Sequence, residues 1–401
     1  MIRLNRIHQN ISIRGLAEIV GIEYSQLSKI ERGMESANVI TIESIFEALD
    51  LDYYQIMAYS SQCKDKIDQI YFDIVYYKDE EYIHSQINKL NKNAYTMGLT
   101  IPLLLINLIF NILRKQPCHY DRLILILSKV EDTMTLLEKQ LFKQYQGFYL
   151  FTKGDFVEAI KKLEEAETFY MDNKTQAMLL YQKGYIYVKH KDYLEAFECL
   201  KNAKLYFEQH HNYIRSAFCS VRIASIYLMM GNYSKAYTMY KEMIEVYYSL
   251  RLKAEDRLIL CRNLLYLCIL MEKYDEFFLV ASSFDEEVKK LLKNEARYFY
   301  YQIIASYHQK DYFLCKQAID QFDIVNKNPF DQYMVTYYRL KAEGATSKDI
   351  VEMLQNGLMA LEKTVCDASN RTILKLLLKE YQDSKDYETL YHYALKLSQY
   401  S

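Results

Sequence analysis

The sequence predicts an all-α protein, in which a short helix-turn-helix domain is followed by a long array of helical hairpins. Three observations lead to this fold class. The 401 residues include only 10 glycines and 3 prolines, whereas all-β and doubly wound folds need such turn residues roughly every 8–12 positions. Short amphipathic segments separated by glycine occupy the first sixty residues. From Gly154 onward, one pattern of small and apolar residues returns with a period of about 40 residues, which is typical of a repeat protein.

Composition and charge exclude several other classes of protein. Apolar residues make up 51% of the chain and charged residues 25%, which excludes wholesale disorder. The net charge of −2 argues against a polyanion binder as a whole. The most apolar stretch, Leu99–Leu113, is too short for a membrane span and contains Pro102 and two asparagines. It predicts a pair of buried helices, and with no signal peptide at the start we expect a cytoplasmic protein.

The chemistry-bearing residues do not form the motif of an enzyme, a metal site or a cofactor site. The 8 cysteines lack CxxC spacing, so we expect buried free thiols. There is no P-loop, GxSxG or HExxH motif. His210 and His211 lie in a predicted polar turn, and Glu164, Glu165 and Glu167 are expected to form a solvated helix face.

The first sixty residues predict a bundle of short helices. Each segment has apolar residues at helical spacing and a polar cap or a glycine at an end. The expected helices are Ile2–His8, a segment capped by Ser12 and ended by Gly21, Tyr24–Arg32 ended by Gly33, a segment capped by Thr41, and Tyr53–Ala58.

The helix Tyr24–Arg32 has the features of a recognition helix. A helix that enters the major groove, about 12 Å wide, needs hydrogen-bonding side chains in its first turn. Leu27 and Ile30 would hold this helix to the core, and nearby cations would contact phosphates. The predicted DNA-binding residues are Arg14, Tyr24, Ser25, Gln26, Lys29 and Arg32.

The segment LAEIVGIEYSQLSKIERG resembles the lambda-repressor-like, or XRE-type, helix-turn-helix domain, and the resemblance covers about residues 1–60. In that family an arginine of the first helix pairs with the glutamate of the motif's ending, which implies a structural ion pair between Arg6 and Glu31. Two positions depart from the pattern. Gly15 stands where the family usually has glutamate, and Ile13 stands where a glutamine or arginine often contacts DNA.

The charge of this domain is unusual for a DNA-binding protein. Residues 1–60 hold five Lys/Arg and eight Asp/Glu, a net charge of −3. Because phosphate contacts dominate affinity for DNA, a single copy should bind weakly. A dimer would double Arg14, Lys29 and Arg32 over two half-sites. A degenerate, protein-binding version of the domain is the alternative.

The repeated pattern predicts helical hairpins after residue 66. Its copies begin at Gly154, Lys191, Gly231, Lys273, Lys310 and Lys385. They resemble tetratricopeptide repeats, most completely in the copy with Leu180, Gly184, Tyr187, Ala196, Leu200 and Ala203. The resemblance implies a right-handed α-solenoid. We therefore expect a helix-turn-helix domain at 1–60, a hinge at 61–66 in the polar segment SSQCKDK, and a peptide-binding and dimerisation domain at 67–401.

The concave face of such a solenoid is lined by the first helix of each repeat. Asparagine and glutamine can bond a peptide backbone, and arginine can clamp a carboxylate. The residues expected there are Gln144, Tyr181, Tyr185, Arg222, Ser225, Arg262, Asn263 and Tyr266, with Tyr301 and Gln302 by a looser alignment. Two alternatives stay open: the arginines could be internal ion-pair partners, and the tyrosines could pack between repeats.

An XRE-type domain followed by tetratricopeptide repeats resembles the RRNPP family of quorum sensors, the Rap, Rgg, NprR, PlcR and PrgX group. The resemblance implies a homodimeric transcription regulator that binds a double-stranded DNA operator and is controlled by a short signalling peptide. Three alternatives remain. They are a repeat adaptor for a protein partner, a phage or plasmid maintenance repressor, and a Rap-like regulator of a response regulator.

Overall fold

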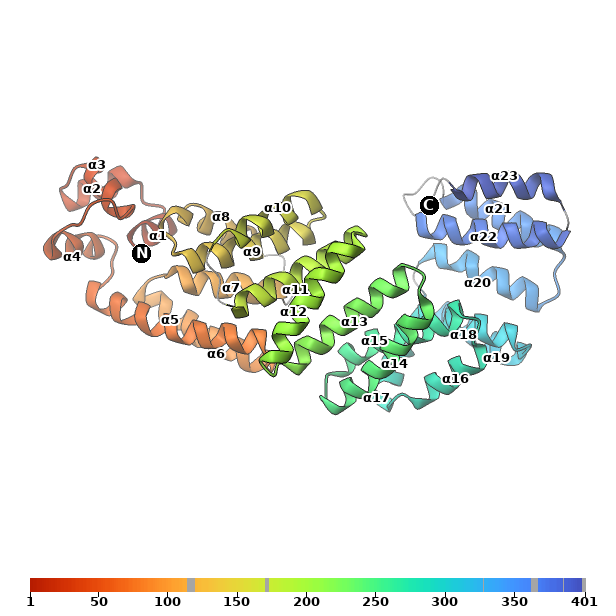
Figure 1. Ribbon diagram of the computed structural model, residues 1–401. Coiled ribbons are helices and arrows are strands. Elements are labelled where there is room, and N and C mark those ends of the chain that lie inside the picture. Colours follow the sequence, from red (N-terminus) through yellow and green to blue (C-terminus); the bar gives the residue numbers. More distant parts are fainter. Residues whose placement is uncertain (114–119, 170–172, 327, 362–366, 385, 399–401) are drawn as a thin grey trace. The chain divides into compact units, whose positions relative to one another are not determined.

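The computed structural model describes residues 1–113, 120–169, 173–326, 328–361, 367–384 and 386–398. Every regular element in these ranges is helical (Figure 1). The all-α fold class with tetratricopeptide-like repeats is confirmed. The chain divides into two compact units, Met1–Ile226 and Tyr227–Ser401. Each unit is described by itself below.

The N-terminal domain opens the first unit with four short helices. They are α1 (Ile2–His8), α2 (Ile13–Val20), α3 (Tyr24–Glu31) and α4 (Val39–Glu47). The Ser12 hydroxyl accepts a hydrogen bond from the Gly15 amide, and Gly21 and Gly33 adopt left-handed φ angles of 76° and 68°. Glycine meets this geometry without steric cost, so both predicted stops are confirmed. The small core contains Leu16, Ala17, Leu27, Ile30, Ile45 and Leu49.

The N-cap of α4 differs from the expected one. The side chain of Asn38, and not that of Thr41, caps this helix, because its Oδ1 accepts a hydrogen bond from the Thr41 amide at 2.8 Å. The helix consequently begins at Val39. Asn38 and Thr41 are both residue types that cap helices well. The sequence pattern places the start of this helix too late, because Val39 and Ile40 of its first turn are exposed and do not continue its apolar face.

The expected hinge at 61–66 is wrong, because these residues form the middle of one helix. The helix α5 runs from Tyr53 to Val75 and includes the segment predicted to end at Ala58. Cys63 and Ile67 are buried in α5, whereas residues 64–66 between them are exposed. The polar segment is therefore the solvated side of an amphipathic helix.

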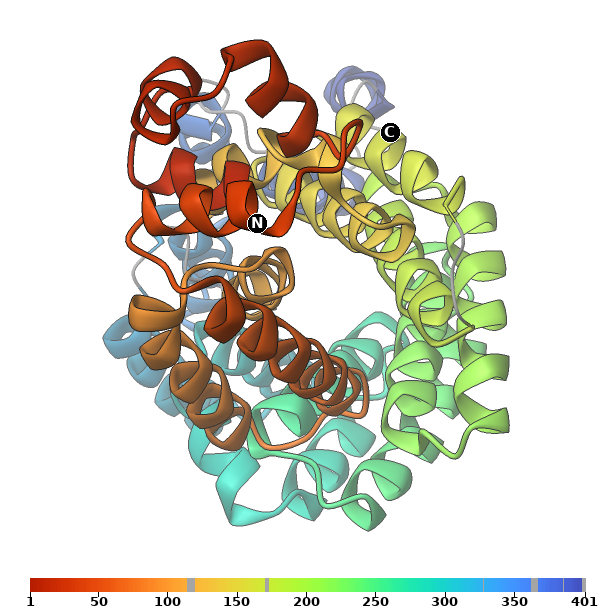
Figure 2. The same ribbon diagram turned by 90° about the vertical axis from the view of Figure 1, so that its left-hand side faces the viewer.

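Antiparallel hairpins build the rest of the first unit. Their helices are α6 (Glu80–Met97), α7 (Ile101–Leu113), α8 (Tyr120–Ser128), η2 (Glu131–Thr133), α9 (Leu136–Thr152), α10 (Phe156–Glu167), α11 (Asn173–His190), α12 (Tyr193–Gln209) and α13 (Tyr213–Met229), which continues past the unit boundary. The helices pack in the pairs α5 and α6, α7 and α8, α9 and α10, and α11 and α12, and α5, α7, α9 and α11 pack in succession. Figure 2 shows the same ribbon from another side.

The apolar stretch Leu99–Leu113 forms one buried helix, α7, and not the expected pair. Pro102 lies in its first turn, where proline fits a helix, so it does not divide the segment. No helix among the described residues is long and apolar enough to cross a membrane.

The repeat turns and helix contacts follow the predicted pattern. A left-handed residue precedes the second helix of successive hairpins, at Gly154, Lys191, Gly231 and Lys310. A Cβ on Gly184 would lie 2.6 Å from the Leu200 Cγ, closer than atoms can approach. The small residue therefore allows α11 and α12 to pack closely, as the sequence indicates.

The second unit continues the hairpin pattern. Its helices are α14 (Tyr233–Ser249), α15 (Ala254–Leu270), α16 (Tyr274–Ser283), α17 (Glu286–Leu292), α18 (Ala296–His308), α19 (Tyr312–Val325), α20 (Pro329–Ala342), α21 (Ser347–Leu361), α22 (Asp367–Ser384) and α23 (Tyr387–Ser398). Tyrosines supply much of its aromatic packing; Tyr338, for example, meets the rings of Tyr300 and Tyr307 edge-on.

Candidate functional site

The helix α3, predicted to be the recognition helix, presents polar side chains at its N-terminal end. Tyr24, Ser25 and Lys29 are exposed, and Gln26 is half-buried. Leu27 and Ile30 are buried in the domain core, as the sequence predicts, and fix the rotation of the helix. The first turn of α3 thus has the hydrogen-bonding surface that a major groove requires.

Cations flank this surface on two sides. The Arg14 guanidinium of α2 lies 5.5 Å from the ring centre of Tyr24. Arg32, at the end of α3, donates to the Ser28 carbonyl and hydroxyl, both at 3.1 Å. Lys29 lies 3.6 Å from Glu35 in an exposed pair, which is worth little in water and leaves the ammonium available to a phosphate.

The ion pair implied by the XRE resemblance is present. Arg6 donates from Nε to the Glu31 Oε1 at 2.6 Å and from Nη2 to Oε2 at 2.9 Å. A third donor, Nη1, reaches the Ile11 carbonyl at 2.9 Å. The pair joins α1 to the end of α3 and has a structural role, as expected.

The N-terminal domain also contacts the repeats of its own unit. Arg3 forms an ion pair with Asp132 of η2 at 2.6 Å. The Asn5 side chain accepts from the Leu99 amide at 2.8 Å and donates to the Leu99 carbonyl at 3.1 Å. The helix α1 is therefore bonded to two separate segments of the repeat array.

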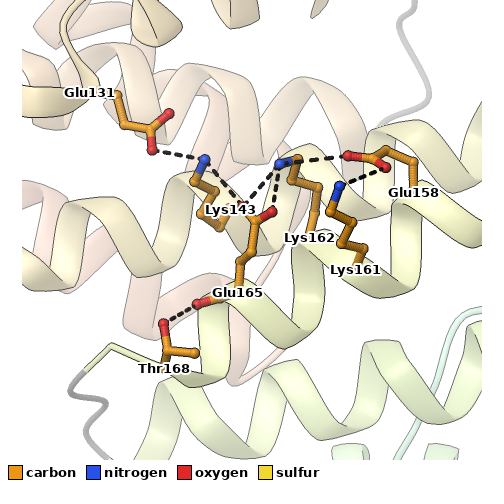
Figure 3. Close-up of polar contacts among 7 residues, drawn as sticks. All are labelled: Glu131, Lys143, Glu158, Lys161, Lys162, Glu165 and Thr168. Carbon is orange, nitrogen blue, oxygen red and sulfur yellow. Dashed lines mark hydrogen bonds and ion pairs between the residues drawn. The ribbon is translucent and has the colours of Figure 1, made fainter.

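A ladder of ion pairs continues from η2 into the repeats (Figure 3). The Lys143 Nζ lies 2.7 Å from Glu131 and 3.3 Å from Glu165. Lys162 then bridges Glu165 at 2.8 Å and Glu158 at 3.6 Å. Lys143 of α9 thus links η2 to α10, and the ladder continues within α10 through Lys162.

The glutamate face predicted as plain solvated surface needs a correction. Glu165 joins the ladder, and Glu167 accepts from the largely buried Lys183 at 2.9 and 3.0 Å. Spacing along one helix cannot reveal Lys143 and Lys183 as partners, because these lysines come from neighbouring helices.

Two of the predicted groove residues, Tyr181 and Tyr185, contact a third, Arg222, in the first unit. The Arg222 guanidinium lies 4.0 Å from the ring centre of Tyr185, and its Nε donates to the Tyr181 hydroxyl at 3.0 Å. Among the described residues no carboxylate pairs with Arg222. Ser225, one turn on, donates to the Val221 carbonyl at 3.0 Å.

Gln144 has a different environment from the expected groove surface. Its side chain is fully buried, accepts from Gln140 at 2.7 Å and donates to Gln182 at 2.8 Å. The three amides form a chain between α9 and α11. In this arrangement Gln144 joins two repeats internally.

The predicted groove residues of the second unit have partners of their own. Arg262 pairs with Glu295 at 3.1 Å, which corresponds to the ion-pair alternative. Asn263 donates to the Tyr240 hydroxyl at 3.0 Å, and the rings of Tyr266 and Tyr301 stack at 5.4 Å. The half-buried Gln302 side chain has no such contact with the described residues.

Six of the eight cysteines lie within the described residues. Cys63, Cys199, Cys219, Cys261, Cys268 and Cys315 are free and buried. Burial raises the pKa of the Cys219 thiol to about 12, which disfavours the reactive thiolate. Cys118 and Cys366 lie outside the described residues. His210 and His211 are exposed at a turn, and within the described ranges no cluster of ligands could hold a metal.

Sequence reasoning missed a contact between α13 and the end of α5. Arg215 donates to the Ile74 and Val75 carbonyls at 2.8 and 2.9 Å, and Asn212 donates to Val75 at 3.1 Å. The partners lie about 140 positions apart. No local pattern in the sequence marks such a pair.

Comparison with known proteins gives a family match for the N-terminal domain and structural matches over most of the chain. Residues 2–56 match the model of a helix-turn-helix family. No curated protein is similar enough in sequence to give a match. Among solved structures, a Rap protein complexed with competence and sporulation factor has 16% identity and a TM-score of 0.64, over 85% of this chain and 98% of that one.

Two structures of the quorum sensor NprR are also similar. The apo form from B. thuringiensis has 15% identity and a TM-score of 0.67, over 85% of this chain and 99% of that one. The complex of NprR with its cognate peptide NprX has 15% identity and a TM-score of 0.54, over 84% and 98%. At these identities the likeness establishes the fold.

The protein is thus a helix-turn-helix protein with a tetratricopeptide-like repeat array. The Rap and NprR structures share the fold of this chain, and both belong to the group that the sequence resembles.

Proposed function

We propose that the protein is a cytoplasmic transcription regulator that binds an operator as a homodimer and is controlled by a short signalling peptide bound to its repeats. In this role the chain binds its partners and catalyses no reaction. The helix-turn-helix domain supplies the DNA contacts through α3. The repeats supply the peptide contacts.

The environment of Arg222 is the observation that carries the peptide proposal. A half-buried guanidinium with two tyrosine rings and no carboxylate beside it is attractive to an anionic group. The carboxylate of a peptide C-terminus fits the planar fork of an arginine. Ser225 adds a hydroxyl one turn further along α13. A similar Rap protein is complexed with competence and sporulation factor, and a similar NprR structure holds its cognate peptide NprX, which supports the same class of ligand here.

The exposed end of α3 supports the DNA proposal. Gln26 and Lys29 would reach base edges, while Arg14 and Arg32 would contact the flanking phosphates. Residues 1–60 carry a net charge of −3, so one copy of the domain should bind DNA weakly. A dimer would bind more tightly, because it doubles the phosphate contacts.

Fluorescence anisotropy with DNA from the gene's own flanking region tests the DNA proposal. We expect saturable binding that weakens steeply with salt and that exceeds binding to a scrambled duplex. Substitution Gln26→Ala should cost about 1–3 kcal/mol of specific binding, whereas Gln209→Ala, in the repeats, should have no effect. Equal binding of the scrambled duplex would contradict the proposal.

Synthetic peptides from a short secreted precursor encoded beside the gene test the peptide proposal. Arg222→Gln should weaken the best peptide at least about tenfold, as expected for loss of a charge-assisted pair. Arg262→Gln is the matched control, because Glu295 already neutralises Arg262. Amidation of the peptide C-terminus should weaken binding to the wild type and not to Arg222→Gln. If amidation has the same effect on both proteins, the carboxylate is not held by Arg222.

A further inference from the structure

A cavity of about 890 Å³ lies in the first unit between α5, α7 and the start of α9. Its floor is aliphatic and includes the buried residues Ile67, Leu105 and Ile109. Met57 and Leu136 stand at its rim and are 43% and 57% exposed. A concave, mostly apolar site of this size is typical of a site for a small ligand.

The cavity is built by single faces of successive first helices. On α5 the lining residues follow helical spacing from Met57 through Lys64 to Tyr71, and on α7 from Ile101 through Leu105 to Ile109. Three facing stripes leave a channel that the described side chains do not fill. The side chains that would be expected to close such a gap, Met57 and Leu136, remain in contact with solvent.

The polar groups at the rim match a peptide better than a bare acyl chain. The Ser60 and Ser61 hydroxyls have no hydrogen-bond partner among the described residues, and a hydroxyl can serve both the N–H and the C=O of a peptide. Charges of both signs also line the cavity, since Lys64 and Asp68 lie one turn apart on α5 and Glu138 lies on α9. Two carboxylates beside one lysine disfavour the carboxylate of a fatty acid, whereas a peptide offers neutral amides.

The cavity adjoins both contacts that hold the N-terminal domain. Met1 of that domain forms part of its wall. Thr100 of the wall follows Leu99, which bonds to Asn5, and Thr133 follows Asp132, which pairs with Arg3. An occupant would therefore touch the two segments to which α1 is bonded.

We infer that this cavity binds aliphatic side chains of a short peptide and that an occupant acts directly on the contacts of α1. The inference rests on the proposed peptide control and adds a second binding position, distinct from Arg222. The neutral aliphatic part of the ligand enters beside the N-terminal domain. Its occupancy alters the Asn5–Leu99 and Arg3–Asp132 contacts.

Methyl NMR of the full-length protein, labelled with [13C-methyl]methionine, tests this inference. The probe is the neutral peptide acetyl-leucyl-leucyl-leucine amide, and dodecanoate is the comparison ligand. The Met57 signal is assigned by its loss in Met57→Leu. We expect the probe to shift the Met57 signal in a saturable manner and dodecanoate to compete poorly.

A matched pair of variants locates the binding. Leu136→Glu places a charge at the rim and should weaken the probe at least about tenfold, since an unpaired charge resists transfer to apolar surroundings. Leu205→Glu, at a position of α12 that is 55% exposed and outside the cavity, should bind as the wild type does. Both positions are exposed, so the fold should tolerate both changes.

The outcomes separate this inference from the proposed function. No shift at Met57, or equal binding by Leu136→Glu, would overturn the cavity site. Stronger binding of dodecanoate would overturn the choice of a peptide ligand. Arg222→Gln should leave the neutral probe unaffected. If the probe binds and no natural peptide does, the proposed function is contradicted. The inference that the cavity binds aliphatic peptide side chains then still stands.

Discussion

Arg3 and Asp132 lie 129 positions apart in the chain, yet the Arg3 Nη1 donates to both carboxylate oxygens of Asp132, at 2.6 and 2.7 Å. The first residue belongs to α1 of the helix-turn-helix domain and the second to η2 of the repeats. Since Glu131, beside Asp132, pairs with Lys143, charge pairs connect the DNA-binding domain to α9. The domain is bonded to the repeats and is not carried on a loose tether.

The Arg3–Asp132 pair should contribute modestly to stability. Both side chains are partly exposed, so a double-mutant cycle with Arg3→Ala and Asp132→Ala should give a coupling of about 0.2–1 kcal/mol. The coupling should fall as salt rises. Urea unfolding at low and high salt measures it, and a coupling independent of salt would contradict an exposed ion pair.

The Asn38 side chain should contribute more to the stability of the fold than the Thr41 side chain does. Asn38→Ala removes the oxygen that holds the Thr41 amide and should cost about 1 kcal/mol. Thr41→Val keeps that bond and the shape of the side chain, so its loss should be smaller. Thermal unfolding of the two variants compares them directly; a larger loss in Thr41→Val would show that Thr41 is the dominant cap.

Local features of the fold were predictable because their signals lie within one helix or one turn. Ser12, Gly21 and Gly33 mark helix ends, and the XRE resemblance led to the Arg6–Glu31 pair. The hinge at 61–66 was predicted wrongly, since a polar segment also forms the solvated side of a helix such as α5.

Partners from distant segments were not predictable from the sequence. Arg222 has no carboxylate partner among the described residues, whereas Arg262 pairs with Glu295. The sequences around the two arginines look alike, since each arginine lies in an apolar helix. Only the packing of neighbouring repeats distinguishes a cation available to a ligand from one that is already neutralised.

Close packing at Gly184 gives a sharp test of the repeat interface. A Cβ there would lie 2.6 Å from the Leu200 Cγ, so Gly184→Ala should destabilise the first unit by about 1–3 kcal/mol. The double variant Gly184→Ala/Leu200→Ala should recover part of what the Gly184 change costs, because it removes the clashing atoms. Differential scanning calorimetry reports both, and full additivity of the two single changes would contradict a direct clash.

Glu276 should make the second unit sensitive to acid. The hydrogen bond from the Tyr237 hydroxyl, with a smaller contribution from Lys273, lowers the pKa of Glu276 below its usual value. A lowered pKa in the folded state stabilises the protein above the unfolded pKa of about 4.3, and this stability is lost as pH falls through the folded pKa. Tyr237→Phe should therefore cost about 1 kcal/mol at pH 7 and less at pH 3. Urea midpoints at the two pH values check this, and an equal loss at both would contradict the charged acceptor.

Of the substitutions considered, replacement of Arg215 should reduce the stability of the protein most. Its buried guanidinium donates to two carbonyls at the C-terminal end of α5, where the helix dipole also favours a cation. Arg215→Ala removes both of these bonds, leaves Asn212 as the side-chain donor to Val75, and should cost about 3 kcal/mol. The exposed Arg122 of α8 is the control, and Arg122→Ala should change stability by less than about 0.5 kcal/mol.

Hydrogen exchange distinguishes a local role of Arg215 from a global one. If Arg215 closes the end of α5, the amides of residues 74–78 should exchange faster in Arg215→Ala, while those of the helix-turn-helix domain keep their protection. Arg215→Lys retains the charge but not the fork that spans two carbonyls, so its effect should lie between those of the wild type and the alanine variant. Uniformly faster exchange across the whole unit would instead mean that Arg215 supports the unit's core.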